Sequence, residues 1–121
     1  MMNSEMFQIL TANAAVQQFL GSPVRVYPWS RAPQNCPRPY AVYSVITALP
    51  ENYLGNLPDL DRKTVQINVY ATTGENLEDC FRVIRDALEP HAHMTSYATP
   101  ALDVDTDLYS CRMDFDFLEN R

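Results

Sequence analysis

Glycine is scarce in this sequence. Only three of the 121 residues are glycines, and they are not clustered. A loop that cradles phosphate groups needs several glycines close together, so a nucleotide-binding loop is not expected. The sequence also has no GxSxG and no CxxC motif. Cys36 or Ser44 with a distant histidine remains open as a hydrolase arrangement, but nothing in the spacing favours it, and we do not expect an enzyme or a cofactor.

Cysteine is equally rare. Cys36, Cys80 and Cys111 are odd in number and widely spaced, which argues against a disulfide framework. Cys80 falls on an apolar helical stripe, and Cys111 falls within an alternating strand pattern. Both are therefore expected to be small core residues in a protein from a reducing compartment.

Long apolar runs are absent as well. No stretch reaches the length of about 18 apolar residues that a membrane-spanning helix needs. The N-terminal sequence MMNSEMFQIL has no basic region ahead of an apolar block, so it does not have the pattern of a signal peptide. These features predict a protein that is made and kept in the cytoplasm.

Basic residues are too few for a nucleic-acid reader. The chain has 9 Lys and Arg against 15 Asp and Glu, which gives a net charge of -6 and a pI near 4.7. Proteins that hold DNA or RNA usually present a basic face to the phosphates, and anionic membrane surfaces attract the same kind of face. Specific nucleic-acid binding and membrane association are therefore not expected.

Two short motifs suggest a metal site, and neither is complete. His91 and His93 form an HxH pair without the further ligands that a zinc site needs, so we expect an exposed loop after a helix. Asp103, Asp105 and Asp107 copy the first three ligands of a calcium loop. That loop requires glycine at its sixth position, where this chain has leucine, and glutamate at its twelfth, where it has aspartate. A weak cation site stays open beside the simpler interpretation of a solvated turn.

The clearest signal is a strand, a turn and a helix between residues 62 and 88. Alternation across 64–70 predicts a half-buried strand. Thr72 stands three residues before Glu75, the spacing of a capping box, and Thr73 with Asn76 is the second option for the start of the helix. Pro90 ends the helix. Its apolar stripe comprises Leu77, Cys80, Phe81, Ile84 and Leu88.

The rest of the chain completes an α+β pattern. A first helix is expected from Ser4 to the C-terminal stop at Gly21, and a second one from the cap at Thr72 or Thr73 to Leu88. Strands are expected at residues 24–27, 40–49, 64–70, 99–104 and 109–117, with 91–99 irregular and Pro100 placing its strand at a sheet edge. The order is α-β-β-β-α-β-β in one domain of residues 1–121. We expect a mostly antiparallel sheet with two helices on one face, because neighbouring strands without crossover helices pair antiparallel.

Two connecting segments are candidates for contact with other proteins. The proline-rich loop 28–39 contains Trp29 and Arg31, residue types common at the centre of interfaces, although Trp29 could equally fill its own core. The connection 50–61 is long for a hairpin and carries more apolar side chains than a solvated loop needs. Its apolar residues are Tyr53, Leu54, Leu57 and Leu60.

Two sequence stretches together resemble a known family. Residues 39–43 read Pro-Tyr-Ala-Val-Tyr, and residues 65–73 read Val-Gln-Ile-Asn-Val-Tyr-Ala-Thr-Thr directly before an amphipathic helix. With the helix and short strand that precede them, these stretches resemble the tail completion proteins of long-tailed bacteriophages, also called tail terminator or tail-to-head joining proteins. The resemblance covers nearly the whole chain.

The resemblance implies a structural role in the virion. Such proteins form a ring, usually of six subunits, on the head-proximal end of the tail tube, where they stop tube growth and meet the head connector. They are assembled in the host cytoplasm. The expected partners are further copies of the chain, the tail tube protein and the connector protein, and DNA passes through the ring without specific binding.

A closed ring needs two different patches that meet on adjacent subunits. We expect the segment 50–61 to form one patch, and the sheet edge near 99–104 or the strand 109–117 to accept it. Acidic side chains that face the hole are expected among Asp59, Asp61, Asp103, Asp105 and Asp107. The alternatives are a head-side neck adaptor, a small-molecule-binding α+β domain with a deep polar pocket, and an adaptor that binds one host protein through Trp29.

Overall fold

The computed structural model describes residues 4–21, 24–28, 37–51, 60–103 and 107–120. It contains three helices and five strands in the described residues, and the strands occur in the predicted order. The elements are α1 Ser4–Ala12, α2 Ala14–Leu20, β1 Val26–Pro28, β2 Tyr40–Glu51, β3 Leu60–Ala71, α3 Gly74–Leu88, β4 His93–Asp103 and β5 Leu108–Asn120. The α+β class is confirmed.

The strands form one sheet in the order β1-β2-β3-β5-β4. All neighbouring pairs are antiparallel except β1 and β2, which run parallel, so the sheet is mostly antiparallel as predicted. The expectation that all such neighbours pair antiparallel was wrong for β1. The connection from Pro28 to Tyr40 has about the dozen residues that a chain needs to return to the same end of a sheet.

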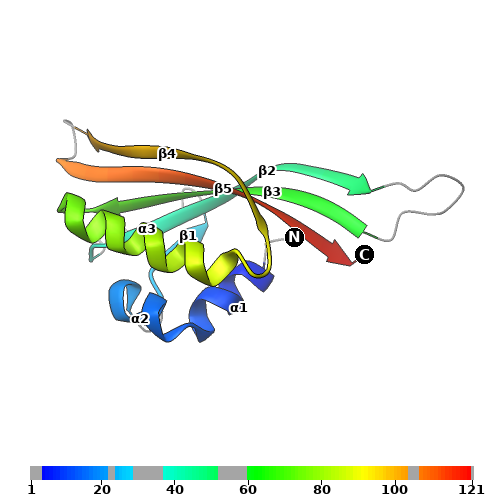
Figure 1. Ribbon diagram of the computed structural model, residues 1–121, viewed down its shortest axis with the longest axis horizontal. Helices are drawn as coiled ribbons and strands as arrows, with labels where there is room; N and C mark the ends of the chain where they lie inside the picture. Colours follow the sequence, from blue (N-terminus) through cyan, green and yellow to red (C-terminus); the bar gives the residue numbers. More distant parts are fainter. Residues whose placement is uncertain (1–3, 22–23, 29–36, 52–59, 104–106, 121) are drawn as a thin grey trace, which may run out of the picture.

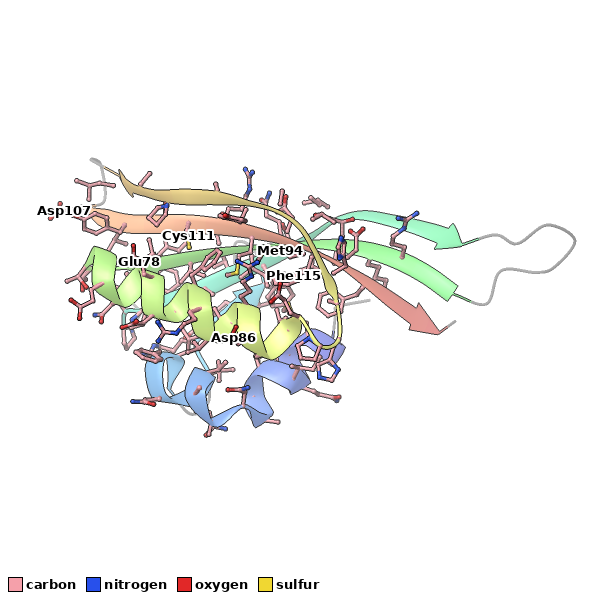
Figure 2. The ribbon with its side chains drawn as sticks, in the orientation of Figure 1. Glu78, Asp86, Met94, Asp107, Cys111 and Phe115 are labelled. Carbon is pink, nitrogen blue, oxygen red and sulfur yellow. The ribbon has the colours of Figure 1, made fainter. Side chains whose placement is uncertain are left out.

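The helices lie on one side of the sheet, as predicted. Figure 1 shows α3 running along this face, with α1 and α2 stacked beneath α3. Alternate side chains of the central strands point into the space between sheet and helix, where Val65 lies opposite Phe115 and Ile67 lies opposite Met113. Figure 2 shows Cys111 and Phe115 on this side of β5, facing α3. The hydrophobic core therefore lies on the helix side of the sheet, between the sheet and α3, and Met6, Leu10, Val16 and Leu20 of α1 and α2 complete it.

The N-terminal helix is interrupted at Asn13, whereas the sequence predicted one helix up to Gly21. Asn13 adopts an extended conformation, with φ -93 and ψ 120, and its side chain accepts a hydrogen bond of 3.1 Å from the backbone N–H of Val16. An asparagine side chain competes with the helical backbone in this way and favours a cap over a helix interior. The stop at Gly21, which has φ 85, is confirmed.

The helix α3 begins at the second of the two predicted caps. Thr73 has the extended conformation of an N-cap, and its hydroxyl accepts a hydrogen bond of 3.1 Å from the N–H of Asn76. The capping box from Thr72 to Glu75 was wrong by one residue. Four of the five residues of the predicted apolar stripe are buried and Phe81 is partly buried, whereas the buried Val83 and Ala87 were not predicted. Pro90 follows two residues after the last helical residue, Leu88.

Strand boundaries were the weakest predictions. Strand β4 begins at His93 and not at residue 99, because its pairing with β5 starts at the register His93 with Asp116. The first half of β4 was not predicted because its residues are largely polar and do not alternate. An edge strand does not need apolar alternation along its whole length. Its position at the edge is confirmed. Strand β2 extends to Glu51 and β3 begins at Leu60, so both outlast their predicted limits.

We predict that Thr73→Ala lowers the free energy of unfolding by about 1 kcal/mol, because the N–H of Asn76 loses its hydrogen-bond acceptor. The neighbouring change Thr72→Ala is the matched control, since Thr72 is exposed and lies before the cap. It should change stability by less than about 0.5 kcal/mol. Urea denaturation of the two variants measures both values, and equal destabilisation would contradict the assigned cap.

Candidate interaction surface

Besides the outer edge of the short strand β1, the sheet has two longer edges that lack a strand partner within the described residues. On one side, β4 pairs only with β5, so its outer edge is open from His93 to Asp103. On the other side, β1 pairs with β2 only from Ala41 to Tyr43. The stretch of β2 from Ser44 to Glu51 therefore has β3 on one side and no described strand on the other. Each edge presents backbone N–H and C=O groups that can pair with another strand.

The second edge lies on an extension of the sheet. Figure 1 shows β2, β3 and β5 continuing beyond the helices, so that their ends project from the body of the molecule. The pairing of β2 with β3 shifts register between Val45 and Thr47 and then continues to Glu51 with Leu60, and the pairing of β3 with β5 continues to Leu60 with Asn120. Residues 52–59 connect the projecting end of β2 to the start of β3, and β5 pairs with β3 there.

Exposed apolar side chains concentrate on these two edges. Among the described residues, four large hydrophobic side chains are exposed, and three of them lie on β2 or β4. Ile46 on β2 is 50% exposed, and Tyr97 and Leu102 on β4 are 54% and 47% exposed. The fourth is Phe7 on α1. Apolar side chains grouped beside open backbone edges are typical of a protein–protein contact.

A shallow groove runs between β4 and α3. The ring of Tyr97 meets the ring of Phe81 edge-on with a centroid distance of 5.5 Å, and the guanidinium of Arg85 lies 5.8 Å from the Tyr97 centroid. Beside this contact is a cavity of about 120 Å³, lined by Glu78, Phe81, Tyr97, Ala98 and Pro100. Its floor is mainly apolar, and Phe81 holds the half-exposed Tyr97 in place beside the open edge.

The sheet face away from the helices is polar, and its aspartate carboxylates lie close to arginine side chains of the same face. The hydroxyl of Thr64 donates a hydrogen bond of 2.6 Å to Asp116, and Arg62 lies 3.9 Å from the same carboxylate. Arg112 lies 3.8 Å from Asp114. The carboxylates on this face therefore have basic partners within the chain, which lowers the charge that the face presents.

Most of the predicted contact residues lie outside the described residues. These are Trp29, Arg31, Tyr53, Leu54, Leu57, Asp59 and Asp105. Leu60 and Asp61 are the first two residues of β3, in the projecting part of the sheet, and Asp103 is the last residue of β4. Asp107 is exposed in the turn before β5 and has φ 58.

The structure does not bring the described acidic residues together. In the strand register, Asp61 lies opposite Glu119 at the projecting end of the sheet, and Asp103 lies opposite Leu108 at the other end. Figure 2 shows Asp107 at that second end, near the start of α3. These acids therefore belong to two separate ends of the sheet.

One of the two predicted acceptor strands cannot accept another strand edge to edge. Strand β5 lies between β3 and β4 and pairs with both, so its backbone groups are already used. The physical reason is that an interior strand has no free edge. The alternative near residues 99–104 belongs to β4, whose outer edge is open.

The contribution of Ile46 and Tyr97 to the open edges was missed by the sequence analysis. A signal for it exists, because residues 40–50 and 94–102 contain no Asp, Glu, Lys or Arg. Natural edge strands commonly carry charges that prevent pairing with other chains. The absence of charges from residues 40–50 and 94–102 would have predicted that these strands pair with another chain at a sheet edge.

The described titratable groups offer little for catalysis. Burial raises the pKa of the Cys80 thiol to about 11, with a smaller contribution from nearby Asp79. Burial also raises the pKa of Cys111 to about 12, and it raises the pKa of the buried Tyr43 phenol. A buried neutral thiol is a poor nucleophile. Within the described part of the chain, no group of three or more His, Cys, Asp or Glu residues is placed to hold a metal ion.

No described helix is both long and apolar enough to cross a membrane. The three larger surface hollows are lined by residues of α1, α3, β3, β4 and β5 and by the segment after α3. They are open depressions. The deep polar pocket expected of a small-molecule-binding domain is not found among the described residues.

The raised thiol pKa values lead to a prediction about pH and reactivity. In a Cys36→Ser variant, the two remaining thiols should react with a maleimide at pH 8 only after the protein unfolds. Above pH 9, an unfolded thiol loses its proton while the folded one keeps it, so the free energy of unfolding should fall as pH rises. Labelling rates and urea denaturation between pH 7 and pH 10 measure this, and rapid labelling of the folded protein would contradict it.

Comparison with known proteins gives a family. The sequence matches the family described as Tail completion protein gp17 over residues 4–119, which includes all three helices and nearly all of the sheet. No individual curated protein matches the sequence significantly. The matched range is almost the entire chain, in agreement with the resemblance found from residues 39–43 and 65–73. The chain therefore belongs to the gp17 family of bacteriophage tail completion proteins, and it is a structural protein of the phage tail.

Proposed function

We propose that the chain forms a ring at the head-proximal end of the tail tube, where it ends tube growth and joins the tail to the head connector. The observation that carries this proposal is the family match over residues 4–119. Its partners are further copies of itself, the tail tube protein and the connector protein. The role requires binding surfaces and no catalysis, which agrees with buried, weakly acidic thiols and shallow surface hollows.

The form of the sheet supports a ring. Head-to-tail contacts use two different patches on each subunit, and they form a closed ring when the rotation between neighbours closes. The two open edges, on β2 and on β4, are different and lie at opposite sides of one sheet. Six subunits, the usual number in such rings, is the ring size that we propose.

The charge of the chain supports passage of DNA through the hole. A net charge of -6 and carboxylates paired with Arg62 and Arg112 leave no basic face on the described sheet surface. DNA is held when cations on a protein replace its counterions, so an acidic or neutral wall lets it move. Asp61, Asp103 and Asp107, together with Asp59 and Asp105, are the proposed acids at the two mouths of the hole.

The segment between β2 and β3 is the proposed contact with a neighbouring subunit. The strands that lead into and out of it, β2 and β3, project from the body of the molecule (Figure 1). The contact residues that we propose are Tyr53, Leu54, Leu57 and Leu60, and Trp29 and Arg31 are proposed for a second contact.

Deletion of the gene from its phage or prophage tests the function. We expect electron microscopy of the lysate to show filled heads beside unattached tails, some of them overgrown. Plasmid-borne wild-type protein should restore joined particles. Tails of normal length beside heads that lose DNA would assign the protein to the head side as a neck adaptor. Intact virions at normal yield would contradict a role in joining.

A triple substitution tests the segment 52–59. Replacing Tyr53, Leu54 and Leu57 together by serine removes the apolar side chains of the segment and changes none of the described core residues. We expect a folded protein, with the far-UV circular dichroism of the wild type, that restores less than about a tenth of joined particles in the deletion phage. Unchanged joining would remove this segment from the proposed contact.

A further inference from the structure

We propose that the open edge of β2, from Ser44 to Glu51, pairs antiparallel with the outer edge of β4 in a second copy of this chain. The ring would then be closed by one continuous sheet. This inference rests on the proposed ring and specifies the contact between its subunits. Four observations on the described residues support it.

The strand directions favour this pairing. Strands β2, β3, β5 and β4 are neighbours in this order, and each pair is antiparallel. Consequently β2 and β4, which carry the two open edges, run in opposite directions. Rotation about a ring axis keeps strand direction relative to that axis. A sheet that continues from one subunit to the next with the same face inward therefore places β4 antiparallel to the next β2.

The charges of this sheet are not placed where they would prevent its edges from pairing with another chain. Natural sheets commonly carry charges on edge strands, where these prevent unwanted pairing. Here most charged residues of the sheet lie on the interior strands β3 and β5, whereas β2 and β4 carry an acidic residue only at their last positions, Glu51 and Asp103, and none within 40–50 or 94–102. The charges of the interior strands are Asp61, Arg62, Lys63, Arg112, Asp114, Asp116 and Glu119. Both edges are therefore suited to being covered.

Apolar side chains accompany both edges. Ile46 projects beside the open edge of β2, and Tyr97 and Leu102 project beside that of β4. The groove between α3 and β4 lies next to Tyr97 and is lined mainly by apolar groups. Pairing of the two edges would bring Ile46 towards this apolar area and remove both from water. Burial of apolar side chains adds to the backbone hydrogen bonds of the new ladder.

The two edges differ in their position along the strands, which suits a ring. The open part of β2 lies on the projecting end, whereas β4 lies alongside α3 (Figure 1). Pairing therefore requires adjacent subunits to be staggered along the strand direction. Closed sheets need such a stagger, because their strands tilt relative to the axis of the barrel. Isologous pairing of β4 with β4 would give a dimer and leave the edge of β2 open.

Paired cysteines test the inference in assembled tails. In a Cys36→Ser background, one cysteine is placed on β2 at Ser44, Thr47 or Leu49, and one on β4 at Ser96, Ala98 or Ala101, positions whose registers put them on the same face of the sheet. The nine variants are supplied to the deletion phage, and purified virions are oxidised and run on a non-reducing gel. Within one subunit the two positions are three strands apart, about 14 Å, whereas a disulfide needs Cα atoms about 4.4–6.8 Å apart. Any cross-link therefore joins two subunits.

We expect a ladder of oligomers that ends at the ring size. In addition, the position on β4 that cross-links best should move towards His93 as the position on β2 moves towards Glu51, which is the signature of antiparallel pairing. Virions that contain the variants but show no cross-link, or show the parallel pattern, would overturn the inference. The proposed function would survive that result, since it fails only if the deletion phage joins heads to tails normally.

A charge on the edge provides a second test. Ala101→Lys places a charged side chain on the outer edge of β4, and Ala15→Lys makes the same change at an exposed position of α2. Both variants should unfold within about 0.5 kcal/mol of the wild type, because both positions are exposed. We expect Ala101→Lys to lower the yield of joined particles at least tenfold and Ala15→Lys to leave it unchanged. Equal yields would overturn the inference.

Discussion

Backbone hydrogen bonding at the sheet edges is the constraint on which this structure depends. Strands β3 and β5 are paired along both edges, whereas β4 and the stretch of β2 from Ser44 to Glu51 are paired on one side only among the described residues. The core lies on one face of the sheet, where α3, α1 and α2 cover it, and it does not cover these edges. A subunit built in this way is folded by its core and remains incomplete at its edges. Assembly with further copies would complete it.

A structural role follows naturally from this arrangement. Among the described residues, the titratable groups with shifted pKa values are core residues, the surface hollows are shallow, and polar side chains do not converge on a deep pocket. The described surface features are an open strand edge, a projecting set of strands, and a polar sheet face whose carboxylates have arginine partners. Membership of the gp17 tail completion family accords with a protein that works by contact.

The sequence predicted the fold where apolar periodicity controls it. The alternation in β3 and β5 and the stripe on α3 were identified because burial on one face imposes a fixed spacing. Asn13 was missed as a helix break because a short polar side chain suits a helix surface nearly as well as a cap. Most of β4 was missed because pairing with β5, and not burial, creates it. The contact surface was predicted only in part: the edge position of Pro100 was identified, but Ile46 and Tyr97 were not, since their exposure depends on which strands become neighbours.

The most direct measurement is a cryo-electron microscopy reconstruction of the head-proximal end of the tail, at a resolution that separates strands. The account predicts a ring in which residues 44–51 of one subunit run antiparallel to β4 of the next at the usual strand spacing of about 4.8 Å. The helices would lie outside, and the polar face of the sheet would line the hole. A ring in which the outer edge of β4 faces solvent, or is covered by the tube or connector protein, would contradict it.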